Sequence, residues 1–174
     1  MSTEVEETRR IVLLRHAKSD HPEGMTDWDR PLAERGRRDA PAAGRWLAER
    51  GIAPDLCVCS PAARTRETWK LAAHELPHRP ATVYEERVYD ASYSTLLAVL
   101  RETPDDVRTL LLVGHNPGMH SLATDLAGDG APDSPHELIR DNFPTCAIAV
   151  LTFASPWTTV ADGIGDLEAS WTPR

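Results

Sequence analysis

Apolar residues in this sequence gather in short runs that alternate with longer segments of helical periodicity. A run of about four to eight apolar residues bounded by turn residues is typical of a buried strand. Strands are predicted on this basis at residues 10–15, 55–60, 81–85, 107–115 and 145–153. A further short strand, residues 157–162, is expected beside the last of these.

The longer segments repeat their apolar residues at the spacing of a helix. In residues 32–50 these residues share one helical face, and Gly51 follows as a stop signal. Ser60 and Pro61 predict the start of another helix, with the serine as N-cap and the proline at the first helical position. Together these patterns predict helices at residues 32–50, 61–76, 92–103 and 117–128.

Strands that alternate with helices predict an α/β fold. The expected architecture is a three-layer sandwich, in which helices cover both faces of a mostly parallel central sheet. Residues 1–8 are expected to form a flexible N-terminal tail, and residues 9–174 a single domain. Residues 19–31, rich in Asp, Pro and Gly, predict a loop between the first strand and the first helix.

Composition narrows the functional classes. The formal net charge of −8 over 174 residues argues against a sequence-independent grip on nucleic acid, which requires a basic surface. The sequence has no apolar run near the roughly 20 residues that cross a bilayer, and its N-terminus is acidic and polar. We therefore expect a cytoplasmic protein that binds neither membrane nor nucleic acid. Its three cysteines, Cys57, Cys59 and Cys146, predict reduced buried thiols rather than disulfides.

Basic side chains stand at three of the predicted strand ends. Arg15 and His16 end the first strand, Arg64 lies just beyond the second, and His115 ends the fourth. Ligands of such sheets bind outside the C-terminal ends of the strands, so neighbouring ends would bring these side chains together. Two guanidinium groups suit a phosphoryl group, because each donates to two oxygens and keeps its charge. Positive neighbours would also favour neutral His16, with the free ring lone pair that a nucleophile toward phosphorus requires.

Other kinds of phosphate chemistry lack their sequence signatures. The chain contains no GxxxxGK[ST] loop and no glycine-rich nucleotide fingerprint. A cysteine phosphatase would need five residues between its thiol and an arginine, whereas four separate Cys59 from Arg64 and six separate Cys57 from Arg64. Neither HExxH nor a CxxC pair occurs, so no metal and no cofactor is expected. These absences favour His16 over a thiol as the nucleophile.

Three motifs in the order LLRHAKS, CSPAARTRETW and VGHNPG resemble those of the histidine phosphatase superfamily, which also contains the phosphoglycerate mutases. The resemblance covers roughly residues 10–153 and implies a phosphoglycerate mutase-like fold. The short length, the RHA-K-S in place of the commoner RHG, and the stretch DRPLAERG are most similar to the small SixA-like phosphohistidine phosphatase branch.

The resemblance implies a role for each basic residue at the strand ends. His16 would take the phosphoryl group as a phosphohistidine, from which water then releases phosphate. Arg15 and Arg64 would hold the phosphoryl oxygens, and His115 would donate to the same oxygens. No metal is needed for this chemistry, because positive charge placed around the transferring group is its expected main source of catalysis.

The family usually adds a carboxyl group that protonates the leaving group. Glu86, followed by Arg87, matches the Glu-Arg pair of the mutases best, with Glu85 and Asp90 as alternatives. A branch that acts on phosphohistidine need not keep such an acid, because a protonated imidazole is itself a good leaving group.

Residues beside these motifs are weaker candidates. Lys18 and Ser19, on the loop after the nucleophile, are candidate substrate-binding residues, as is Arg30. Asn116 and Gly118 are expected to shape the turn into the next helix. The remaining histidines have no partner pattern and are expected in surface or packing positions; they are His21, His74, His78, His120 and His136.

The leading hypothesis is a phosphatase that forms a covalent phosphohistidine and acts on phosphohistidine in a protein. Few residues separate the third and fourth strands, so no large insertion forms a lid, and an open site would admit a protein surface. A mutase is disfavoured, because isomerisation requires an intermediate shielded from water. The alternatives are a small-molecule phosphomonoesterase of the same superfamily and a phospholigand-binding module without turnover.

Overall fold

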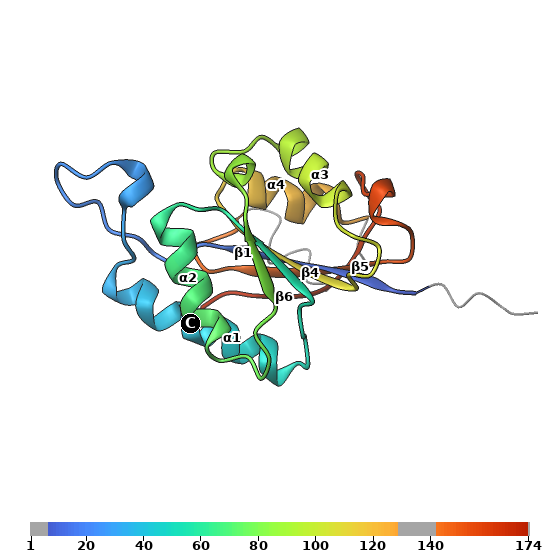
Figure 1. The fold of residues 1–174 in the computed structure, drawn as a ribbon, viewed down its shortest axis with the longest axis horizontal. Coiled ribbons are helices and arrows are strands. Elements are labelled where there is room, and N and C mark those ends of the chain that lie inside the picture. The colour runs from blue at the N-terminus through green and yellow to red at the C-terminus, as the bar shows by residue number, and fades with distance from the viewer. Residues whose placement is uncertain (1–6, 129–141, 174) are drawn as a thin grey trace, which may run out of the picture.

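The computed structural model describes residues 7–128 and 142–173. Within these ranges a six-stranded sheet runs through the middle of the molecule (Figure 1). Its strands are β1 (Arg9–Arg15), β2 (Leu56–Cys59), β3 (Ala81–Tyr84), β4 (Thr109–Gly114), β5 (Ile148–Phe153) and β6 (Asp166–Trp171). The predicted tail, apart from its last two residues, and His136 lie outside the described ranges.

Helices flank both faces of the sheet. They are α1 (Glu34–Glu49), α2 (Ala63–Ala73), α3 (Tyr93–Arg101) and α4 (Gly118–Asp125), with the 3₁₀ turns η1 (Asp27–Asp29), η2 (Glu86–Val88) and η3 (Trp157–Thr159). The pair α1 and α2 covers one face and the pair α3 and α4 the other, which confirms the predicted three-layer sandwich (Figure 1). Among the described residues, no helix combines the length and apolar character needed to cross a bilayer.

The strand order, β3-β2-β4-β1-β5-β6, determines which strand ends are neighbours. β3, β2, β4 and β1 are parallel neighbours, whereas β5 is antiparallel to β1 and β6 is antiparallel to β5. The prediction of a mostly parallel sheet is therefore confirmed. Arg15 at the end of β1 pairs with Gly114 at the end of β4, and Cys59 at the end of β2 pairs with Val113. The C-terminal ends of these three strands thus meet at one edge of the sheet.

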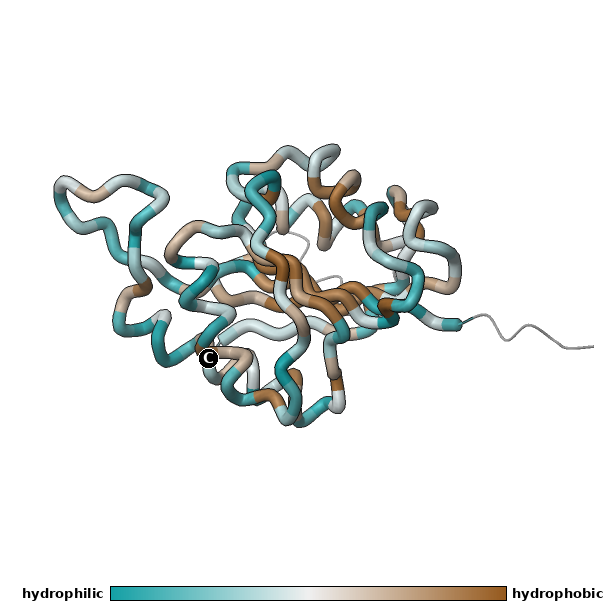
Figure 2. Tube along the Cα trace, in the orientation of Figure 1, coloured by the Kyte–Doolittle hydropathy of each residue, from teal (hydrophilic) through white to brown (hydrophobic). Residues whose placement is uncertain are grey.

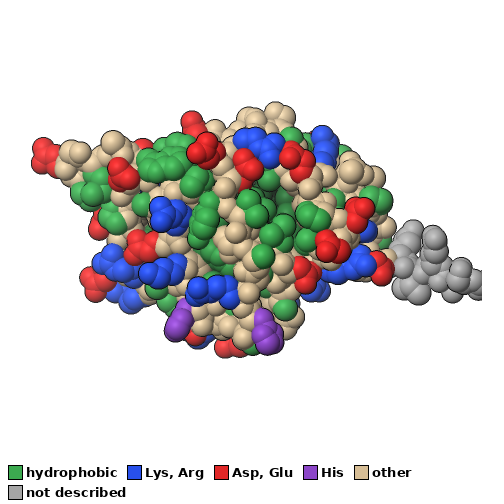
Figure 3. Space-filling view, viewed as in Figure 1, with side chains coloured by type: hydrophobic (Ala, Val, Ile, Leu, Met, Phe, Trp, Pro, Cys, Tyr) green, Lys and Arg blue, Asp and Glu red, His purple; other side chains and the backbone are tan. Residues whose placement is uncertain are grey.

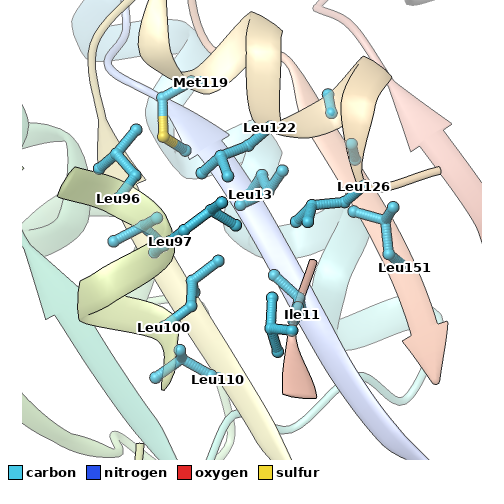
Figure 4. Close-up of a cluster of buried hydrophobic side chains, with 14 of the residues drawn as sticks. Ile11, Leu13, Leu96, Leu97, Leu100, Leu110, Met119, Leu122, Leu126 and Leu151 are labelled. Carbon is cyan, nitrogen blue, oxygen red and sulfur yellow. The ribbon is translucent and has the colours of Figure 1, made fainter. Parts of the chain in front are cut away.

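β1 is buried on both faces, which explains its unbroken aliphatic run. Ile11 and Leu13 pack toward α3 and α4, where leucines from both helices surround them (Figure 4). Val12 and Leu14 pack toward α1 and α2 on the opposite face. Figure 2 shows hydrophobic residues concentrated in the central strands, and hydrophilic residues over much of the loops and of the helix below the sheet. A strand fixed on both faces holds the residues at its end in a defined position.

Two glycines let α1 approach its neighbours closely. A Cβ atom at Gly44 would lie 2.1 Å from the carbonyl oxygen of Ala72 in α2, and one at Gly36 would lie 2.1 Å from that of Lys18. The Lys18 carbonyl also accepts a hydrogen bond from the backbone N–H of Ala33 at 2.8 Å. The start of α1 therefore fixes the chain that leaves the end of β1.

The predicted strand at residues 157–162 is wrong. The chain forms the 3₁₀ turn η3 there, and the buried Trp157 donates its indole N–H to the carbonyl of Val107 at 2.8 Å. Two apolar side chains of this stretch, Trp157 and Val160, are buried in the core, and its backbone does not pair with the sheet. The strand beside β5 is β6, in which exposed and buried residues alternate at first.

The predicted N-cap role of Ser60 is also wrong. α2 begins at Ala63, its N-cap position is Ala62, and that position makes no side-chain cap hydrogen bond. The Ser60 hydroxyl oxygen lies 2.7 Å from Nε2 of His115, and it makes a longer contact of 3.4 Å with the backbone N–H of Ala62. Because the helix begins three residues after Ser60, this hydroxyl is left at the strand ends rather than at the helix terminus.

Candidate active site

His16 directly follows β1 and is buried, with 7% of its surface exposed. Its Nδ1 lies 2.8 Å from the carbonyl oxygen of Ala17. A carbonyl oxygen can only accept a hydrogen bond, so Nδ1 carries the ring proton and Nε2 of the neutral ring keeps its lone pair. The lone pair that a nucleophile needs is therefore on Nε2.

The pKa of His16 is lowered from its ordinary value to about 3. Burial is the largest cause, and the hydrogen bond to Ala17 opposes it. The charges of His115, Arg15 and Arg64 lower the pKa further. The lowered pKa supports the predicted neutral imidazole, and burial contributes more to it than the positive neighbours from which the prediction was made.

His115 follows β4 and lies beside His16, with a distance of 5.3 Å between the ring centroids. The contact between its Nε2 and the Ser60 hydroxyl fixes the orientation of the ring. Burial, followed by the charge of Arg64, lowers the pKa of His115 to about 4. Two neutral imidazoles thus lie side by side at the ends of β1 and β4.

The two predicted arginines reach this pair of histidines from different elements. Arg15 ends β1, and its Nη1 donates to the carbonyl of Phe143 at 3.2 Å. Arg64 lies in the first turn of α2 and is buried. The Nε atoms of both side chains are buried without a hydrogen-bond partner among the described residues. Burial, and then the charge of Arg64, lowers the pKa of Arg15, because the two cations share one site. The structure therefore brings together all four basic residues of the predicted strand ends.

A carboxylate of the protein, Asp27 in η1, lies against Arg64. Nη1 of Arg64 donates to the backbone carbonyl of Asp27 at 2.8 Å, and Nη2 donates to Oδ2 at 3.1 Å. The Tyr89 hydroxyl donates to the same Oδ2 at 2.5 Å, and Arg30 donates to Oδ1 at 3.0 Å. These contacts, with the Tyr89 hydrogen bond as the largest cause, hold the pKa of Asp27 well below its ordinary value. Asp27 is therefore an anion whose carboxylate occupies Nη2 of Arg64, while its backbone carbonyl occupies Nη1.

Aromatic rings enclose the same side of the site. The ring of Tyr89 packs edge-on against His115, with 5.5 Å between centroids, and edge-on against Trp28, with 4.8 Å between centroids. Trp28 belongs to η1, in the middle of the loop predicted at residues 19–31. This loop folds back over the N-terminal end of α2, so it contributes both a carboxylate and a wall to the site.

The weaker candidates on this loop have different surroundings. Lys18 is exposed, and its side chain makes no hydrogen bond or ion pair with another described residue. Ser19 is buried, and its hydroxyl accepts a hydrogen bond from Arg30 at 2.6 Å. Arg30 also donates to the backbone carbonyl of Asp20 at 3.1 Å. Ser19 and Arg30 therefore hold the loop in shape, and of these three residues Lys18 has the side chain that a ligand could engage.

The candidate general acids lie on or beside η2. Glu86 is exposed, and its side chain makes no hydrogen bond or ion pair within residues 7–128 and 142–173. Glu85 accepts from Arg87 at 2.9 Å, and Arg87 donates to Glu102 at 2.7 Å. Asp90 is exposed and has a φ of 53°. Among the described residues, the carboxylate that contacts one of the four predicted basic residues is that of Asp27, which accepts from Arg64.

The three cysteines are free and buried, as predicted. Burial raises the pKa of Cys59 to about 12 and also raises that of Cys57 and Cys146. A thiol acts as a nucleophile in its thiolate form, which burial in apolar surroundings disfavours. The buried, protonated thiols support the choice of His16 rather than a cysteine as the nucleophile.

Known proteins share both the sequence pattern and the fold. Residues 11–95 match the model of the histidine phosphatase superfamily (branch 1). An uncharacterized protein of Mycobacterium tuberculosis is 41% identical over 162 residues, which cover 92% of this chain and 100% of that protein. The structure of a candidate SixA phosphohistidine phosphatase from Nakamurella multipartitia matches with a TM-score of 0.82 and 32% identity, over 95% of this chain and 96% of that one. The chain belongs to the histidine phosphatase superfamily.

A second solved structure shows the same likeness of this histidine phosphatase to SixA-type proteins. A candidate SixA phosphohistidine phosphatase from Agrobacterium tumefaciens matches with a TM-score of 0.77 and 31% identity, over 95% of this chain and 98% of that one. These neighbours confirm the predicted phosphoglycerate mutase-like fold class and, with the family model, support phosphatase activity.

Three of the residues that shape this histidine phosphatase site were not predicted from the sequence as site residues, namely Asp27, Tyr89 and Ser60. The sequence carries one signal for Asp27, since the stretch DWDR places two carboxylates beside an arginine in the loop after the nucleophile. Tyr89 follows the predicted Glu-Arg pair by two residues, and nothing in its neighbours marks it as a contact of His115.

We expect the variant Asp27→Asn to bind inorganic phosphate about tenfold more tightly, because the carboxylate no longer competes with phosphate for Arg64. The inhibition constant of phosphate against hydrolysis of an aryl phosphate measures this. Asp29→Asn is the matched control, since it removes the same charge two residues away, where the carboxylate accepts from Thr26 at 2.9 Å. Weaker phosphate binding in Asp27→Asn would show instead that the carboxylate positions Arg64.

Proposed function

We propose that this histidine phosphatase removes the phosphoryl group from phosphohistidine in a protein, through a covalent phosphohistidine at His16. The observation that carries the proposal is the hydrogen bond from Nδ1 of His16 to Ala17, which leaves the lone pair on Nε2. That ring lies beside Arg15 and Arg64, two cations suited to phosphoryl oxygens.

The first step forms a bond between Nε2 of His16 and phosphorus and breaks the bond between phosphorus and the substrate nitrogen. The substrate ring takes a proton from solvent on its other nitrogen before this step, so the imidazole departs as a neutral ring with that electron pair. Arg15 and Arg64 hold the phosphoryl oxygens. To do so, Arg64 gives up its hydrogen bonds to Asp27 and donates to the phosphoryl group in their place. The positive charges stabilise the negative charge of the transferring group.

The second step transfers the phosphoryl group to water. A water oxygen bonds to phosphorus, the bond to Nε2 of His16 breaks, and inorganic phosphate leaves. The proton lost by water goes to the phosphate product or to solvent, and the imidazole returns to its neutral form. His115 lies beside the reacting ring, with 5.3 Å between the ring centroids, and its ring is oriented by Ser60, so we expect it to donate to a phosphoryl oxygen.

The surroundings of the candidate acids support a phosphohistidine substrate over a phosphomonoester. An alkoxide leaving group needs a proton from the enzyme, whereas an imidazole with an ordinary pKa near 6.5 does not. Glu86 and Asp90 are exposed, and Glu85 is engaged by Arg87. Between β3 and β4 the chain holds η2 and α3, without a larger insertion that would cover the site.

A radiolabelled phosphohistidine protein tests the proposal. Mixing it with the enzyme and quenching within one turnover should transfer label to the enzyme, in a bond that is stable to base and labile to acid. A panel with an aryl phosphate, sugar phosphates and nucleotides should show the highest kcat/KM for the phosphohistidine protein. Absence of the labelled enzyme would refute the covalent mechanism, and a preference for a sugar phosphate would assign the chain as a small-molecule phosphomonoesterase.

The two buried histidines predict that the fold weakens as the solution becomes acidic. Their pKa values in the folded protein, about 3 and about 4, lie below the value of about 6.5 for an unfolded histidine. The unfolded chain therefore binds more protons as pH falls below about 6.5, and each histidine lowers the free energy of unfolding by up to about 1.4 kcal/mol per pH unit.

Urea unfolding at pH 7 and pH 5 measures this effect above the range in which most carboxylates titrate. The double variant His16→Asn/His115→Asn should lose less stability between these two pH values than the original chain. The variant His74→Asn/His78→Asn, at exposed positions, is the control. An identical loss in the original chain and in the His16/His115 variant would contradict the assignment of neutral buried imidazoles.

A further inference from the structure

An open groove of about 700 Å³ lies between α2 and β3, apart from the histidine site. Trp69 of α2 lines it, and its indole N–H donates to the hydroxyl of Thr82 in β3 at 2.9 Å. Arg66 and Lys70 from α2 and Arg79 from the chain before β3 also line the groove. Nothing in the chemistry described so far uses these three cations.

The groove is cationic although the chain as a whole carries a net charge of −8. In the described part of the chain, no ion pair neutralises Arg66, Lys70 or Arg79. Glu67 is the single carboxylate among the lining residues, and it accepts a hydrogen bond from the backbone N–H of Leu32 at 3.1 Å. Figure 3 shows Lys and Arg side chains gathered over α2 on this face. A local positive field in an acidic protein favours an acidic partner.

β3 forms the second side of the groove and contributes an aromatic ring to it. Tyr84 of β3 lines the groove and is exposed by 50%, and Arg66 lies over its ring at 6.0 Å. β3 is the last strand in the sheet order, so its outer edge pairs with no other strand of the described chain. An unpaired strand edge offers backbone donors and acceptors to an extended peptide, and neighbouring side chains add specificity.

The groove begins beside the candidate active site. α2 carries Arg64 in its first turn and Arg66 two residues later, so one helix serves both regions. Tyr84 ends β3 at the same edge of the sheet at which β1, β2 and β4 end. From there the groove follows α2 away from the site toward Ala73. A polypeptide that presents a phosphorylated residue to the strand ends can therefore extend along this groove.

We propose that the groove between α2 and β3 binds an extended acidic segment of the phosphoprotein substrate. This inference depends on the proposed protein phosphohistidine phosphatase activity. The carboxylates of the segment pair with Arg66, Lys70 and Arg79, and its backbone lies along the outer edge of β3. The groove thereby selects among phosphoproteins, while the histidine site performs the same chemistry on each.

Charge reversal in the groove provides the test. The variant Arg66→Glu/Lys70→Glu is compared with Arg35→Glu/Arg38→Glu, which makes the same change of charge on exposed positions of α1. Three substrates are used with each enzyme: a phosphohistidine peptide with aspartate and glutamate flanks, the same peptide with serine flanks, and phosphoramidate. Phosphoramidate has no flanks, so its hydrolysis reports folding and the histidine site alone.

We expect the groove variant to raise KM for the acidic peptide about tenfold or more, with kcat retained, because repulsion replaces attraction at the groove. Hydrolysis of phosphoramidate and of the serine-flanked peptide should change by less than about twofold. The α1 variant should leave KM for all three substrates within the same limit. Higher salt should weaken the preference of the original enzyme for the acidic flank.

Different failures have different meanings. If both phosphopeptides are hydrolysed with one KM in the original enzyme and in the groove variant, the docking proposal is wrong and the proposed function stands. If phosphoramidate is hydrolysed and neither peptide is, the proposed protein substrate is wrong and the docking proposal fails with it. If vesicles containing phosphatidylserine bind the original enzyme and not the groove variant, while KM for the acidic peptide is unchanged, the groove is a membrane contact instead.

Discussion

The variant His16→Asn should lower phosphatase turnover by about 10⁴-fold or more, because it removes the lone pair on Nε2 that forms the bond to phosphorus. The asparagine amide nitrogen has no lone pair available for this attack. Its N–H can still donate toward the carbonyl of Ala17, which accepts from Nδ1 of His16 in the original chain. The variant is therefore expected to fold, and its loss of activity to be a loss of chemistry.

Two measurements check this expectation. Single-turnover labelling should give no acid-labile phosphoenzyme in His16→Asn, and steady-state turnover should fall to the background rate. His78→Asn, at an exposed histidine between α2 and β3, should keep full activity and full labelling. Turnover close to the original rate in His16→Asn would transfer the role of nucleophile to another group, and His115 would be the first to test.

Removal of the second guanidinium should have the next largest effect. We expect Arg64→Ala to lower kcat/KM by about 10³-fold, because two donors that stabilise charge on the transferring phosphoryl group disappear from a buried site. Asp27 keeps its contacts with Tyr89 and Arg30 in this variant, so the loop over α2 remains anchored. Arg64→Lys should recover part of the lost activity, since it restores a charge without the two-pronged geometry.

The kinetics of both variants should be compared with Arg45→Ala, which removes an exposed guanidinium of α1 that pairs with Glu75 at 3.1 Å. Thermal unfolding of each variant separates loss of fold from loss of chemistry. A folded Arg64→Ala enzyme with unchanged kcat/KM would remove this arginine from the phosphoryl site. A loss confined to KM would show instead that Arg64 contributes equally to binding of the substrate and of the transition state.

The positions of the four basic residues could be predicted because each depends on short-range features. Arg15 and His16 follow a run of aliphatic residues that only a buried strand explains, and His115 follows a second such run. Parallel strands linked by helices then place their C-terminal ends at one edge, whatever the details of packing. Arg64 lies one short connection beyond β2, so the same rule places it there.

The contacts of the loop over α2 could not be predicted, because they join residues far apart in the chain. Asp27 meets Arg64 across 37 positions and Tyr89 across 62. Loop residues have no hydrophobic period, so the sequence does not show which way such a segment folds. Ser60 was assigned by a local rule for helix starts, and a tertiary hydrogen bond to His115 overrides that rule.

The end of the chain illustrates a different difficulty. Residues 157–162 contain a large aromatic ring and β-branched residues, which favour a strand, and the requirement to bury Trp157 in the core outweighs that preference. β6 alternates polar and apolar residues over all six of its positions, so the sequence carried a strand pattern here, and the expectation of a strand at residues 157–162 took its place.

The burial of the cysteines, together with the proposed nucleophile at His16, would make the activity of this enzyme independent of the redox state of its surroundings. Peroxide converts exposed thiolates to sulfenic acids, and a phosphatase that depends on such a sulfur stops working until a reductant restores it. Here Cys59 lies at the end of β2 with its thiol buried and protonated, and the proposed nucleophile, on His16, is a ring nitrogen that forms no sulfenic acid. On this mechanism, phosphate removal would continue under oxidising conditions that silence thiol-dependent phosphatases.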